Sequence, residues 1–360
     1  MAQDPRRILI VRLSALGDVV MASGLIPALR ARYPQAELHW VCEAACVPLL
    51  RHNPRLASVI VWPRQEWEQL ARARRYLALW RAIRAFRAQL RALRFDLVLD
   101  AQGLLKSALI AWLTGAPRRV GLIAREGSRW LVHEVATPPA GADPVMGSEY
   151  RYLARWLGAP EGSFQPDLAV GDEPRSRARQ VLAQEAAGAL SPPAPPVPPT
   201  GLAALAPFTT RPQKHWVDAH WQALFEQLLA RGLRPVVLGG PADREAAQRL
   251  VAPVPGAISL AGALRLDESA ALIAEAQLLI GVDTGLTHMG SALGVPTVAL
   301  FGSTYPYRQG PTPRTQVMYD ALPCSPCRRR PTCGGAYTCM RELTPERVMP
   351  VALTLLQGAP

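Results

Sequence analysis

The chain has 360 residues, of which 49% are hydrophobic, so it is long enough to form about two domains with sizeable cores. It contains no run of about 18 uncharged apolar residues, and no membrane-spanning helix is therefore expected. The formal net charge of +12 favours an anionic partner, which could be nucleic acid, acidic lipid or an acidic substrate.

The N-terminal sequence MAQDPRRILIVRLSALGD is interpreted as a first β-strand and turn. A signal peptide also begins with basic residues and an apolar run, but here Arg12 and Asp18 interrupt the run and no small-residue cleavage site follows. Without an export signal, the six cysteines are expected to be reduced, as in the cytosol.

Short apolar runs alternate with helical patterns, and this alternation occurs twice along the chain. We expect strands at residues 7–12, 37–42, 58–62, 95–99, 202–206, 234–239, 278–282 and 296–301. We expect helices at residues 18–32, 66–93, 103–113, 147–157, 173–187, 217–231, 242–251, 267–275, 285–293 and 345–356. Strands separated by helices are typical of βαβ units, so the prediction is an α/β protein with parallel sheets.

The sequence LSPPAPPVPPT at residues 190–200 is too rich in proline for a helix or an interior strand. We expect it to be a stiff, extended surface segment, with the domain boundary near residues 170–200. In open α/β sheets, ligands bind beyond the carboxyl ends of the strands. The motifs at those ends are therefore the candidates for a site in a cleft between two facing domains.

Asp18 follows the first strand, in the turn SALGD where a helix begins. Ser14 is positioned to cap this helix, and Gly17 provides a permissive turn residue. The commoner role of an aspartate at such a position is a helix cap. The functional alternative is a carboxylate that projects into the cleft as a general base.

Lys106 lies in the first turn of the helix after the strand at residues 95–99, close to Asp100, Gln102 and Gly103. A cation at this end of a helix opposes the helix dipole, which is unfavourable unless an anion binds there. Lys106 is one of only two lysines among 40 basic residues, and the other is Lys214.

Lys214 follows the strand at residues 202–206, in the sequence APFTTRPQKHW. Its ammonium, with the hydroxyl and N–H groups of Thr209 and Thr210, could hold a diphosphate near the start of the helix at residue 217. Lysine is a compact charge on a flexible stem, whereas arginine is a rigid fork.

Asp283, Thr284 and Gly285 follow the strand at residues 278–282, and His288 lies one turn into the next helix. N–H groups at a helix start can receive a phosphate, and Asp283 can accept hydrogen bonds from sugar hydroxyls. The alternative for Asp283 is a plain helix cap. The dense glycine pattern and His288 favour the functional interpretation.

Asp243 and Glu245 open the helix after the strand at residues 234–239. Acidic residues suit a helix N-terminus electrostatically, and one of them could instead hold a pair of ribose hydroxyls. The chain has no G-x-G-x-x-G, no P-loop and no D-x-D sequence. A standard dinucleotide fingerprint and the commonest carboxylate arrangement for a divalent metal with a sugar nucleotide are therefore missing.

Two further segments leave alternatives open. Residues 72–94 contain eight arginines beside an apolar stripe, which predicts either a helix with a solvated edge or a surface for anionic lipid headgroups. Cys324, Cys327, Cys333 and Cys339 have the spacing C-x₂-C-x₅-C-x₅-C, which is compatible with reduced thiols, a disulfide or a zinc site.

Four motifs together resemble the ADP-heptose:lipopolysaccharide heptosyltransferases of glycosyltransferase family 9. They are ILIVRLSALGDVVMASGLIPAL, DAQGLLKSAL, TTRPQKHWVDAHW and VDTGLTHMGSALGVPTVALFG, and they follow in matching order over nearly the whole chain. DAQGLLKSA and TTRPQKHW are most similar to heptosyltransferase I, whereas the cysteine-rich tail is more similar to other branches of the family.

This resemblance implies the GT-B architecture, in which two Rossmann-like doubly wound domains face each other across a cleft. Residues 1–171 would form the acceptor-binding domain and residues 172–345 the nucleotide-sugar-binding domain. Residues 346–360 would form a C-terminal helix, which in this family often crosses back to the first domain.

The resemblance also implies an inverting, metal-independent transfer of heptose from ADP-heptose to a Kdo or heptose hydroxyl of the lipopolysaccharide inner core. Asp18 matches the catalytic base, and Lys214 would stabilise the leaving diphosphate. The positions matching donor-binding residues are Thr209, Thr210, Lys214, Asp243, Asp283, Thr284, Gly285 and His288. The positions near acceptor-binding residues are Arg64, Lys106 and Arg125.

The expected partners are a nucleotide-sugar donor, an acidic Kdo-lipid A acceptor and the cytoplasmic surface of the inner membrane, with no nucleic acid and no cofactor. The expected location is cytoplasmic and peripheral on that membrane. One alternative is a nucleotide-sugar epimerase of the same fold, which would turn over the donor without an acceptor. A second is a non-enzymatic protein that binds anionic lipid or nucleic acid through its arginines.

Overall fold

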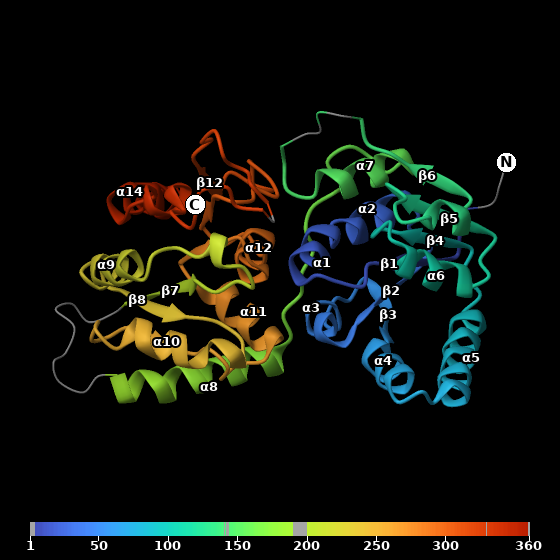
Figure 1. The fold of residues 1–360 in the computed structure, drawn as a ribbon, viewed down its shortest axis with the longest axis horizontal. Coiled ribbons are helices and arrows are strands. Elements are labelled where there is room, and N and C mark those ends of the chain that lie inside the picture. The colour runs from blue at the N-terminus through green and yellow to red at the C-terminus, as the bar shows by residue number, and fades with distance from the viewer. Residues whose placement is uncertain (1–3, 140, 142–143, 190–199, 329, 359–360) are drawn as a thin grey trace. The chain divides into compact units, whose positions relative to one another are not determined.

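The chain folds into two compact units, each built on one parallel sheet (Figure 1). The structure is a computed structural model that describes residues 4–139, 141, 144–189, 200–328 and 330–358. The first unit contains Met1–Asp143 and Gly147–Ala169, and the second contains Pro144–Met146 and Val170–Pro360. The prediction of an α/β protein with two parallel sheets is confirmed. Residues 190–199 of the predicted proline-rich segment lie outside the described residues.

The first sheet has six parallel strands in the order β3-β2-β1-β4-β5-β6. They are β1 (Arg7–Val11), β2 (Glu37–Glu43), β3 (Leu56–Trp62), β4 (Leu97–Asp100), β5 (Arg118–Leu122) and β6 (Glu134–Ala136). After Arg7, the central strand β1 is an unbroken apolar run, with residues 8–11 fully buried, as expected for a parallel strand covered on both faces. β5 and β6 are missing from the predicted set because RRVGL and EVA contain few apolar residues.

Helices cover this sheet and connect its strands. They are α1 (Leu16–Ala22), α2 (Leu25–Arg32), α3 (Val47–Leu50), α4 (Arg64–Arg72), α5 (Tyr76–Ala92), α6 (Leu105–Leu113) and α7 (Ser148–Trp156), with short 3-10 helices η1 (Ala44–Cys46) and η2 (Ser128–Leu131). Phe86 and Leu90 of α5 join Ile110 of α6 in a core cluster with Leu9 and Val11 of β1. This cluster fixes α5 and α6 on one face of the sheet.

The helix predicted at residues 18–32 is divided into α1 and α2, with Ser23 and Gly24 between them. The Ser23 hydroxyl donates to the Val20 carbonyl (2.7 Å) and accepts from the Asp167 N–H (2.8 Å). A Cβ at Gly24 would lie 2.7 Å from the ring of Phe164. Contacts with a segment more than 100 residues away in the chain therefore end α1. The local sequence pattern does not indicate these contacts.

The single long helix predicted at residues 66–93 is also wrong, because α4 and α5 form an antiparallel pair that turns at residues 73–75. The Arg75 N–H donates to the Leu70 carbonyl and the Arg74 N–H donates to the Ala71 carbonyl, which is the Schellman arrangement at a helix C-terminus. Arg74 adopts a left-handed conformation (φ 54°) that glycine usually provides. An arginine at this position gives no sequence signal for a turn.

The second sheet also has six parallel strands, in the order β12-β11-β10-β7-β8-β9. They are β7 (Gly201–Ala206), β8 (Leu233–Val237), β9 (Ile258–Ser259), β10 (Leu278–Val282), β11 (Thr297–Phe301) and β12 (Thr315–Tyr319). β10, β7 and β8 are neighbours, so the loops that follow them lie at adjacent places along one edge. β9 and β12 are too short or too polar to have been predicted.

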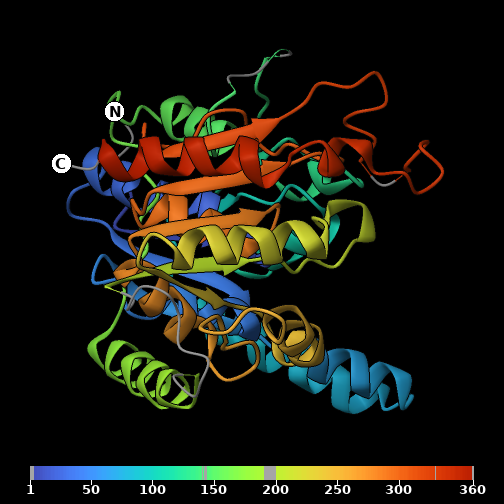
Figure 2. The ribbon, with the colours of Figure 1, turned by 90° about the vertical axis from the view of Figure 1, so that its left-hand side faces the viewer.

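The helices of the second unit are α8 (Asp172–Ala189), α9 (Asp218–Leu229), α10 (Arg244–Val251), α11 (Leu266–Glu275), α12 (Gly285–Ala292), α13 (Thr338–Arg341) and α14 (Pro345–Gln357), with 3-10 helices η3 (Pro212–Lys214) and η4 (Pro241–Asp243). Figures 1 and 2 show α9 and α14 side by side over one face of the sheet. Val348, Met349 and Ala352 of α14 belong to the core of this unit. The C-terminal helix is therefore packed on the sheet of its own unit.

Candidate active site

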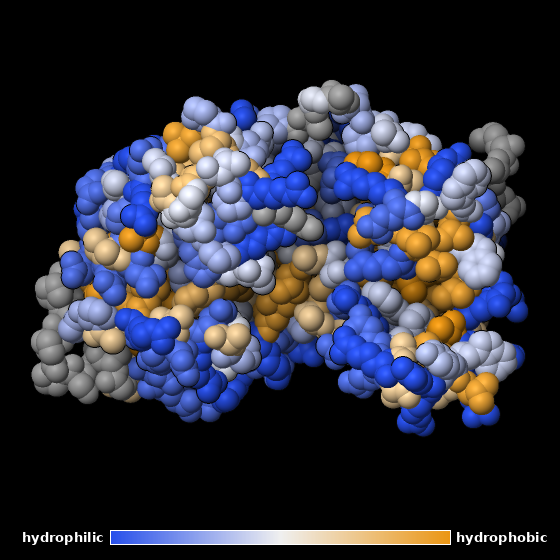
Figure 3. Space-filling model, viewed as in Figure 1, coloured by the Kyte–Doolittle hydropathy of each residue, from blue (hydrophilic) through white to orange (hydrophobic). Residues whose placement is uncertain are grey.

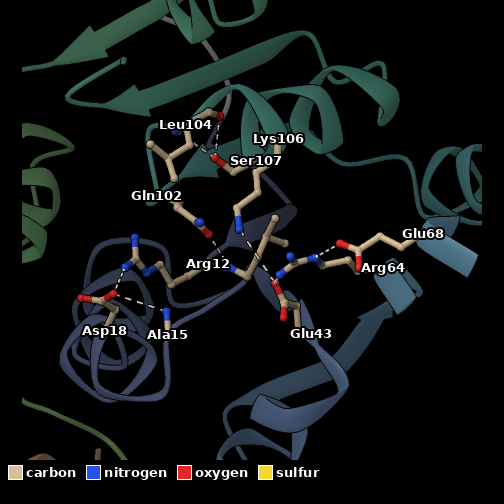
Figure 4. A network of polar contacts seen from close by, with 11 residues as sticks. Arg12, Ala15, Asp18, Glu43, Arg64, Glu68, Gln102, Leu104, Lys106 and Ser107 are labelled. Atoms are coloured by element: carbon tan, nitrogen blue, oxygen red, sulfur yellow. Dashed lines mark hydrogen bonds and ion pairs between the residues drawn. The ribbon is translucent and has the colours of Figure 1, made fainter. Parts of the chain in front are cut away.

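Asp18 pairs with a buried arginine that the sequence reasoning did not assign to the site. The Asp18 carboxylate is the third residue of α1, and its Oδ2 accepts from the Ala15 N–H at 3.3 Å (Figure 4). The same Oδ2 forms an ion pair with Nη2 of Arg12, which follows β1 and is 8% exposed. Asp18 is therefore not a plain N-cap, because its carboxylate faces a cation.

Among the described residues, the hydrogen bond and the closest ion-pair contact of Asp18 both use Oδ2, and the Asp18 side chain is 37% exposed. Arg12 donates a hydrogen bond from Nη1 to the Ala101 carbonyl (3.3 Å). Its guanidinium carbon also lies 5.8 Å from the centre of the Tyr150 ring. Burial by itself lowers the pKa of Arg12, but Tyr150 and Asp18 outweigh it and keep the pKa raised. A permanent positive charge thus stands beside Asp18.

Glu43 at the end of β2 joins two of the cations predicted to bind the acceptor (Figure 4). Its Oε1 lies 3.1 Å from Nη1 of Arg64 and 3.9 Å from Nζ of Lys106. Arg64 also donates from Nε to Glu68 at 2.6 Å, and Lys106 lies 5.9 Å from the centre of the Trp62 ring. Arg64 and Lys106 therefore lie together around one carboxylate, at the carboxyl ends of β2, β3 and β4.

Asp100 and Gln102 build the turn that presents Lys106. The Asp100 side chain is fully buried, and its Oδ1 accepts from the N–H groups of Gln102 (3.1 Å) and Gly103 (3.0 Å). Burial raises the pKa of Asp100 although these bonds lower it. Gln102 accepts from the Leu13 N–H at 2.9 Å, which ties this turn to the segment after β1. Asp100 thus shapes the turn and is not exposed to a ligand.

Arg125, the third predicted acceptor-binding residue, is exposed. Its N–H donates to the Gly103 carbonyl at 2.8 Å, so the backbone of its loop lies against the turn before Lys106. The structure brings this loop to the same edge of the sheet but gives the Arg125 side chain no contact with Arg64 or Lys106.

Lys214 and Asp283 form the centre of a second group, in the second unit. Lys214 ends η3 after β7, and Asp283 follows β10. Lys214 Nζ donates to Asp283 Oδ2 at 2.6 Å, and the two side chains are 17% and 11% exposed. Asp283 precedes the helix cap, which is Thr284, so the interpretation of Asp283 as a plain cap is wrong.

Asp283 has two more partners. Nε2 of His288 lies 3.3 Å from Asp283 Oδ1, and the Thr304 hydroxyl donates to Oδ2. Burial alone would raise the pKa of Asp283, but the bonds and charges of His288 and Lys214 outweigh it and hold this pKa well below its usual value. Asp283 is therefore ionised and fixed in position.

His288 is oriented from behind by Tyr307, a residue that the sequence reasoning missed. The Tyr307 hydroxyl lies 2.9 Å from Nδ1 of His288, and Tyr307 is 2% exposed. The Tyr307 ring packs edge-on against Phe301 at 5.2 Å between ring centres. Since the hydroxyl occupies Nδ1, Nε2 is the nitrogen that faces Asp283.

The other residues predicted to bind the donor in the loops after β7 and β10 lie at the same edge of the second sheet. Thr209 is half-buried and Thr210 exposed, in the loop that also carries Lys214. One ring nitrogen of His215 lies 2.8 Å from the Thr209 carbonyl and closes this loop. Thr284 and Gly285 form the start of α12, directly after Asp283.

Asp243 lies after β8, one strand further along the edge. Its Oδ2 accepts from the Gly240 N–H at 2.8 Å, so part of this carboxylate is used to cap η4. A Cβ at Gly239 would lie 2.9 Å from the Phe208 ring, which shows that the loops after β7 and β8 are in contact. The structure gives Asp243 no contact with Lys214 or Asp283.

The cysteine-rich segment forms no disulfide among its four described thiols. Cys324 is exposed, Cys327 and Cys333 are partly buried, Cys339 is buried, and all four thiols are free. Among the described residues, no three His, Cys, Asp or Glu side chains are grouped to hold a metal ion, so the zinc interpretation gains no support. Every helix in the described part of the chain is too short or too polar to span a bilayer.

Comparison with known proteins gives consistent results. The family model of glycosyltransferase family 9 (heptosyltransferase) matches residues 83–337. The chain is 33% identical to lipopolysaccharide heptosyltransferase 1 of Pseudomonas aeruginosa, over 91% of this chain and 87% of that protein. It resembles the solved structure of Escherichia coli ADP-heptose lipopolysaccharide heptosyltransferase II with a TM-score of 0.75 and 26% identity, over 98% of both chains.

A further structure, Escherichia coli heptosyltransferase WaaC with ADP-2-deoxy-2-fluoro heptose, has a TM-score of 0.72 at 24% identity and covers 97% of this chain and 99% of its own. These structures share the pair of parallel sheets, which confirms the predicted GT-B type of fold. The extent of the sequence match decides the family. The chain therefore belongs to glycosyltransferase family 9, the heptosyltransferases, and is a glycosyltransferase.

Proposed function

We propose that the chain transfers heptose from ADP-heptose to a Kdo or heptose hydroxyl of the lipopolysaccharide inner core, with inversion and without a metal ion. Family membership supports the reaction class. The donor and acceptor are suggested by relatives named lipopolysaccharide heptosyltransferase and by the ADP-heptose analogue bound to WaaC. The observation that carries the proposal for this chain is the group of Lys214, Asp283 and His288 at the start of α12.

The donor diphosphate is proposed to bind beside Lys214, Thr209, Thr210 and the start of α12. Asp283 takes one of the three N–H donors of Lys214, which leaves two for phosphate oxygens. The first N–H groups of a helix have no partner within the helix and carry partial positive charge. A diphosphate there would therefore meet both a cation and a helix N-terminus.

The sugars of the donor are proposed to be held by acidic residues at the same edge. Asp243 keeps Oδ1 open for a ribose hydroxyl, because Oδ2 is used by Gly240. Asp283, fixed by His288 and Thr304, is proposed to accept from a heptose hydroxyl. Carboxylates are strong acceptors for such hydroxyls.

In the proposed reaction, the acceptor hydroxyl oxygen attacks the anomeric carbon of heptose while the bond from that carbon to the diphosphate breaks. The hydroxyl proton passes to Asp18, and the electron pair of the broken bond leaves with ADP. Lys214 and the start of α12 stabilise the charge that develops on the diphosphate. One donor of this kind is worth about 10²–10³ in rate in other oxyanion sites.

Asp18 is the proposed base because its side chain is 37% exposed and its Oδ2 is fixed by Arg12 and the Ala15 N–H. We propose that Oδ1 takes the proton. Arg12 is assigned a positioning role: it orients the carboxylate before the acceptor arrives. A carboxylate within hydrogen-bond reach of the acceptor hydroxyl can then take its proton.

Arg64, Lys106 and Arg125 are proposed to bind the acidic acceptor. Arg64 and Lys106 share Glu43, and an incoming carboxylate or phosphate would compete with Glu43 for these cations. Because the proposed acceptor is anchored to lipid A, we propose that the chain works at the cytoplasmic face of the inner membrane.

A panel of nucleotide sugars, each incubated with Kdo-lipid A in the presence of EDTA, tests this proposal by mass spectrometry of the product. The proposal predicts one added heptose with ADP-heptose and no product with the other donors. Conversion of the donor without any acceptor would indicate an epimerase. An unchanged donor under all conditions would favour a non-enzymatic binding protein.

A further inference from the structure

Helix α6 is apolar on the side that faces solvent as well as on the side that faces the core. Its sequence LKSALIAWL buries Ala108, Ile110 and Ala111. Leu105, Leu109 and Trp112 nevertheless remain 42%, 42% and 46% exposed. Their spacing of four and three residues places them in one stripe along the helix. The exposed stripe of an ordinary surface helix is polar, so this one needs an explanation.

The exposed apolar surface continues from α6 onto its neighbours. Trp130 on η2, which packs against α6, is 89% exposed. Leu77 and Trp80 on α5 are 76% and 54% exposed. We name Leu77, Trp80, Leu105, Leu109, Trp112 and Trp130 the tryptophan surface.

Contacts made by two arginine side chains of α5 show that α5 and α6 form one continuous surface. The guanidinium of Arg87 on α5 lies 5.9 Å from the ring centre of Trp112 on α6, and Nε of Arg91 lies 3.4 Å from the Leu113 carbonyl. Figure 3 shows hydrophobic residues gathered over α6, and fewer over α5, between strongly hydrophilic ones. The pattern is a mixed apolar and charged face, not one isolated side chain.

The charge of this face is of one sign. Residues 69–95 contain eight arginines and no acidic residue. Arg75, Arg81 and Arg84 are exposed, and none of them has a carboxylate partner among the described residues. The guanidinium of Arg84 lies 4.6 Å from the centre of the Trp80 ring. These arginines are therefore free for an external anion.

We propose that the tryptophan surface and the arginines of α5 dock on a bilayer that contains anionic phospholipids. Tryptophan prefers the boundary between headgroups and acyl chains, leucine gains free energy on leaving water, and arginine pairs with lipid phosphate. A nucleic acid would also attract the arginines, but it offers no apolar phase for Leu77, Leu105 and Leu109. The chemistry of the whole face thus favours a membrane.

This inference deepens the proposed function, since Lys106 directly follows Leu105 of the tryptophan surface on α6, with its ammonium directed to Glu43. Docking by this face would bring a proposed acceptor-binding cation to the plane of the lipid that anchors the acceptor. The membrane interaction itself depends only on the surface, so it can be measured without any transfer reaction.

Co-sedimentation of the full chain with vesicles tests the docking. The vesicles contain either phosphatidylcholine alone or phosphatidylcholine with phosphatidylglycerol. One test variant carries Trp80→Ser, Trp112→Ser and Trp130→Ser, and a second carries Arg75→Gln, Arg81→Gln and Arg84→Gln. The matched controls are Trp156→Ser, whose residue is 38% exposed on α7, and the triple variant Arg177→Gln, Arg231→Gln and Arg249→Gln in the second unit.

The wild type is expected to bind the anionic vesicles and to bind the neutral ones far more weakly. The arginine variant should lose affinity on the order of 100-fold, because a basic residue near an anionic surface contributes about fivefold. The tryptophan variant should also bind more weakly than the wild type, because it removes apolar area that would leave water on docking. The controls should bind within about threefold of the wild type. Circular dichroism and thermal melting should be unchanged in all variants, since every altered side chain is exposed.

Three results would overturn the docking proposal: equal binding by the test variants and the wild type, equal losses in test and control variants, or tighter binding to a single-stranded oligonucleotide than to anionic vesicles. Transfer assays separate this proposal from the proposed function. With a deacylated, soluble Kdo acceptor the tryptophan variant should keep the wild-type rate, and with Kdo-lipid A in vesicles it should be slower. A wild type that transfers to neither acceptor refutes the transferase proposal and leaves the vesicle result standing.

Discussion

The ammonium of Lys214 lies 2.6 Å from the carboxylate of Asp283, and both side chains are largely buried. A lysine in this place is notable because the chain contains only one other, Lys106. The pairing holds a cation with two unused donors beside the first turn of α12. Asp18 and Arg12 form a second pair of a carboxylate and a cation, in the first unit.

Replacing Lys214 should lower kcat, because the new side chain would be less able to move with the leaving diphosphate. Lys214→Arg keeps the charge but imposes a rigid fork, and a loss of about 10²-fold in kcat with an unchanged melting temperature is expected. Lys106→Arg is the only matched lysine substitution in the chain, and it should raise the KM for the acceptor without changing the affinity for ADP. A Lys214→Arg enzyme with the wild-type kcat would remove the proposed role.

Asp283 should make the folded chain less stable as the pH falls below about 4. Its pKa is lowered in the folded state, so its contribution is fully present above the ordinary value of 3.8 and is lost as the pH falls towards the folded pKa. The difference in melting temperature between the wild type and Asp283→Asn should be constant from about pH 7 to 5 and shrink below about pH 4. Glu245→Gln, at an exposed position, is the control. A difference that stays constant down to pH 3 would show that Asp283 gains nothing from its ionised form.

Asp18→Asn should remove the proposed base, and it also removes the ion-pair partner of Arg12. A general base contributes about 10²–10⁴ to the rate, so kcat should fall by that amount while ADP binds as in the wild type. Arg12→Met should lower kcat less, since it removes the partner that orients Asp18 and not the carboxylate itself. Calorimetry with ADP and steady-state rates distinguish these effects. Transfer at the wild-type rate by Asp18→Asn would exclude the base assignment.

Tyr307→Phe should test the orientation of His288. The phenylalanine ring can keep the packing on Phe301, while the hydroxyl that lies 2.9 Å from Nδ1 of His288 is lost. We expect weaker binding of the donor, by about tenfold, with a melting temperature close to that of the wild type. If calorimetry shows unchanged donor affinity, Tyr307 serves the core alone.

Gly103 should be among the least replaceable residues of the first unit. It has a positive φ of 68°, and an added Cβ would lie 2.0 Å from the Leu122 carbonyl oxygen. Gly127 has a similar φ of 77° with nothing within 4 Å, so Gly127→Ala measures the backbone strain alone, about 1 kcal/mol. Gly103→Ala should cost more than twice as much free energy of unfolding in urea. Equal costs for the two variants would show that the Leu122 strand moves to accommodate the methyl group.

The parallel sheets and most helices could be predicted because apolar runs and helical periodicity are local properties. The ends of α1 and α4 could not, since one depends on Phe164 packing on Gly24 and the other on an arginine in a left-handed conformation. At the site, Lys214 and Asp283 were predicted separately from their places after two strands. Their pairing depends on the strand order β10-β7, which the sequence does not state.

The missed residues share one property. Arg12, Glu43, Thr304 and Tyr307 act on other side chains of the site, so the chemistry of a ligand does not reveal them. Arg12 and Glu43 did carry a weak signal, because each is a charged residue at the end of a buried strand. Tyr307 carried none, since a buried tyrosine is most simply explained as part of a core.

The most direct test of the central claim follows heptose itself. Wild type and Asp18→Asn are incubated with ADP-heptose, Kdo-lipid A and EDTA, and the acceptor is analysed by mass spectrometry. The account predicts one added heptose with the wild type, and a rate lower by about 10²–10⁴ with the variant, which still binds ADP. Consumption of ADP-heptose without a heavier acceptor, or a strict need for a divalent metal ion, would contradict it.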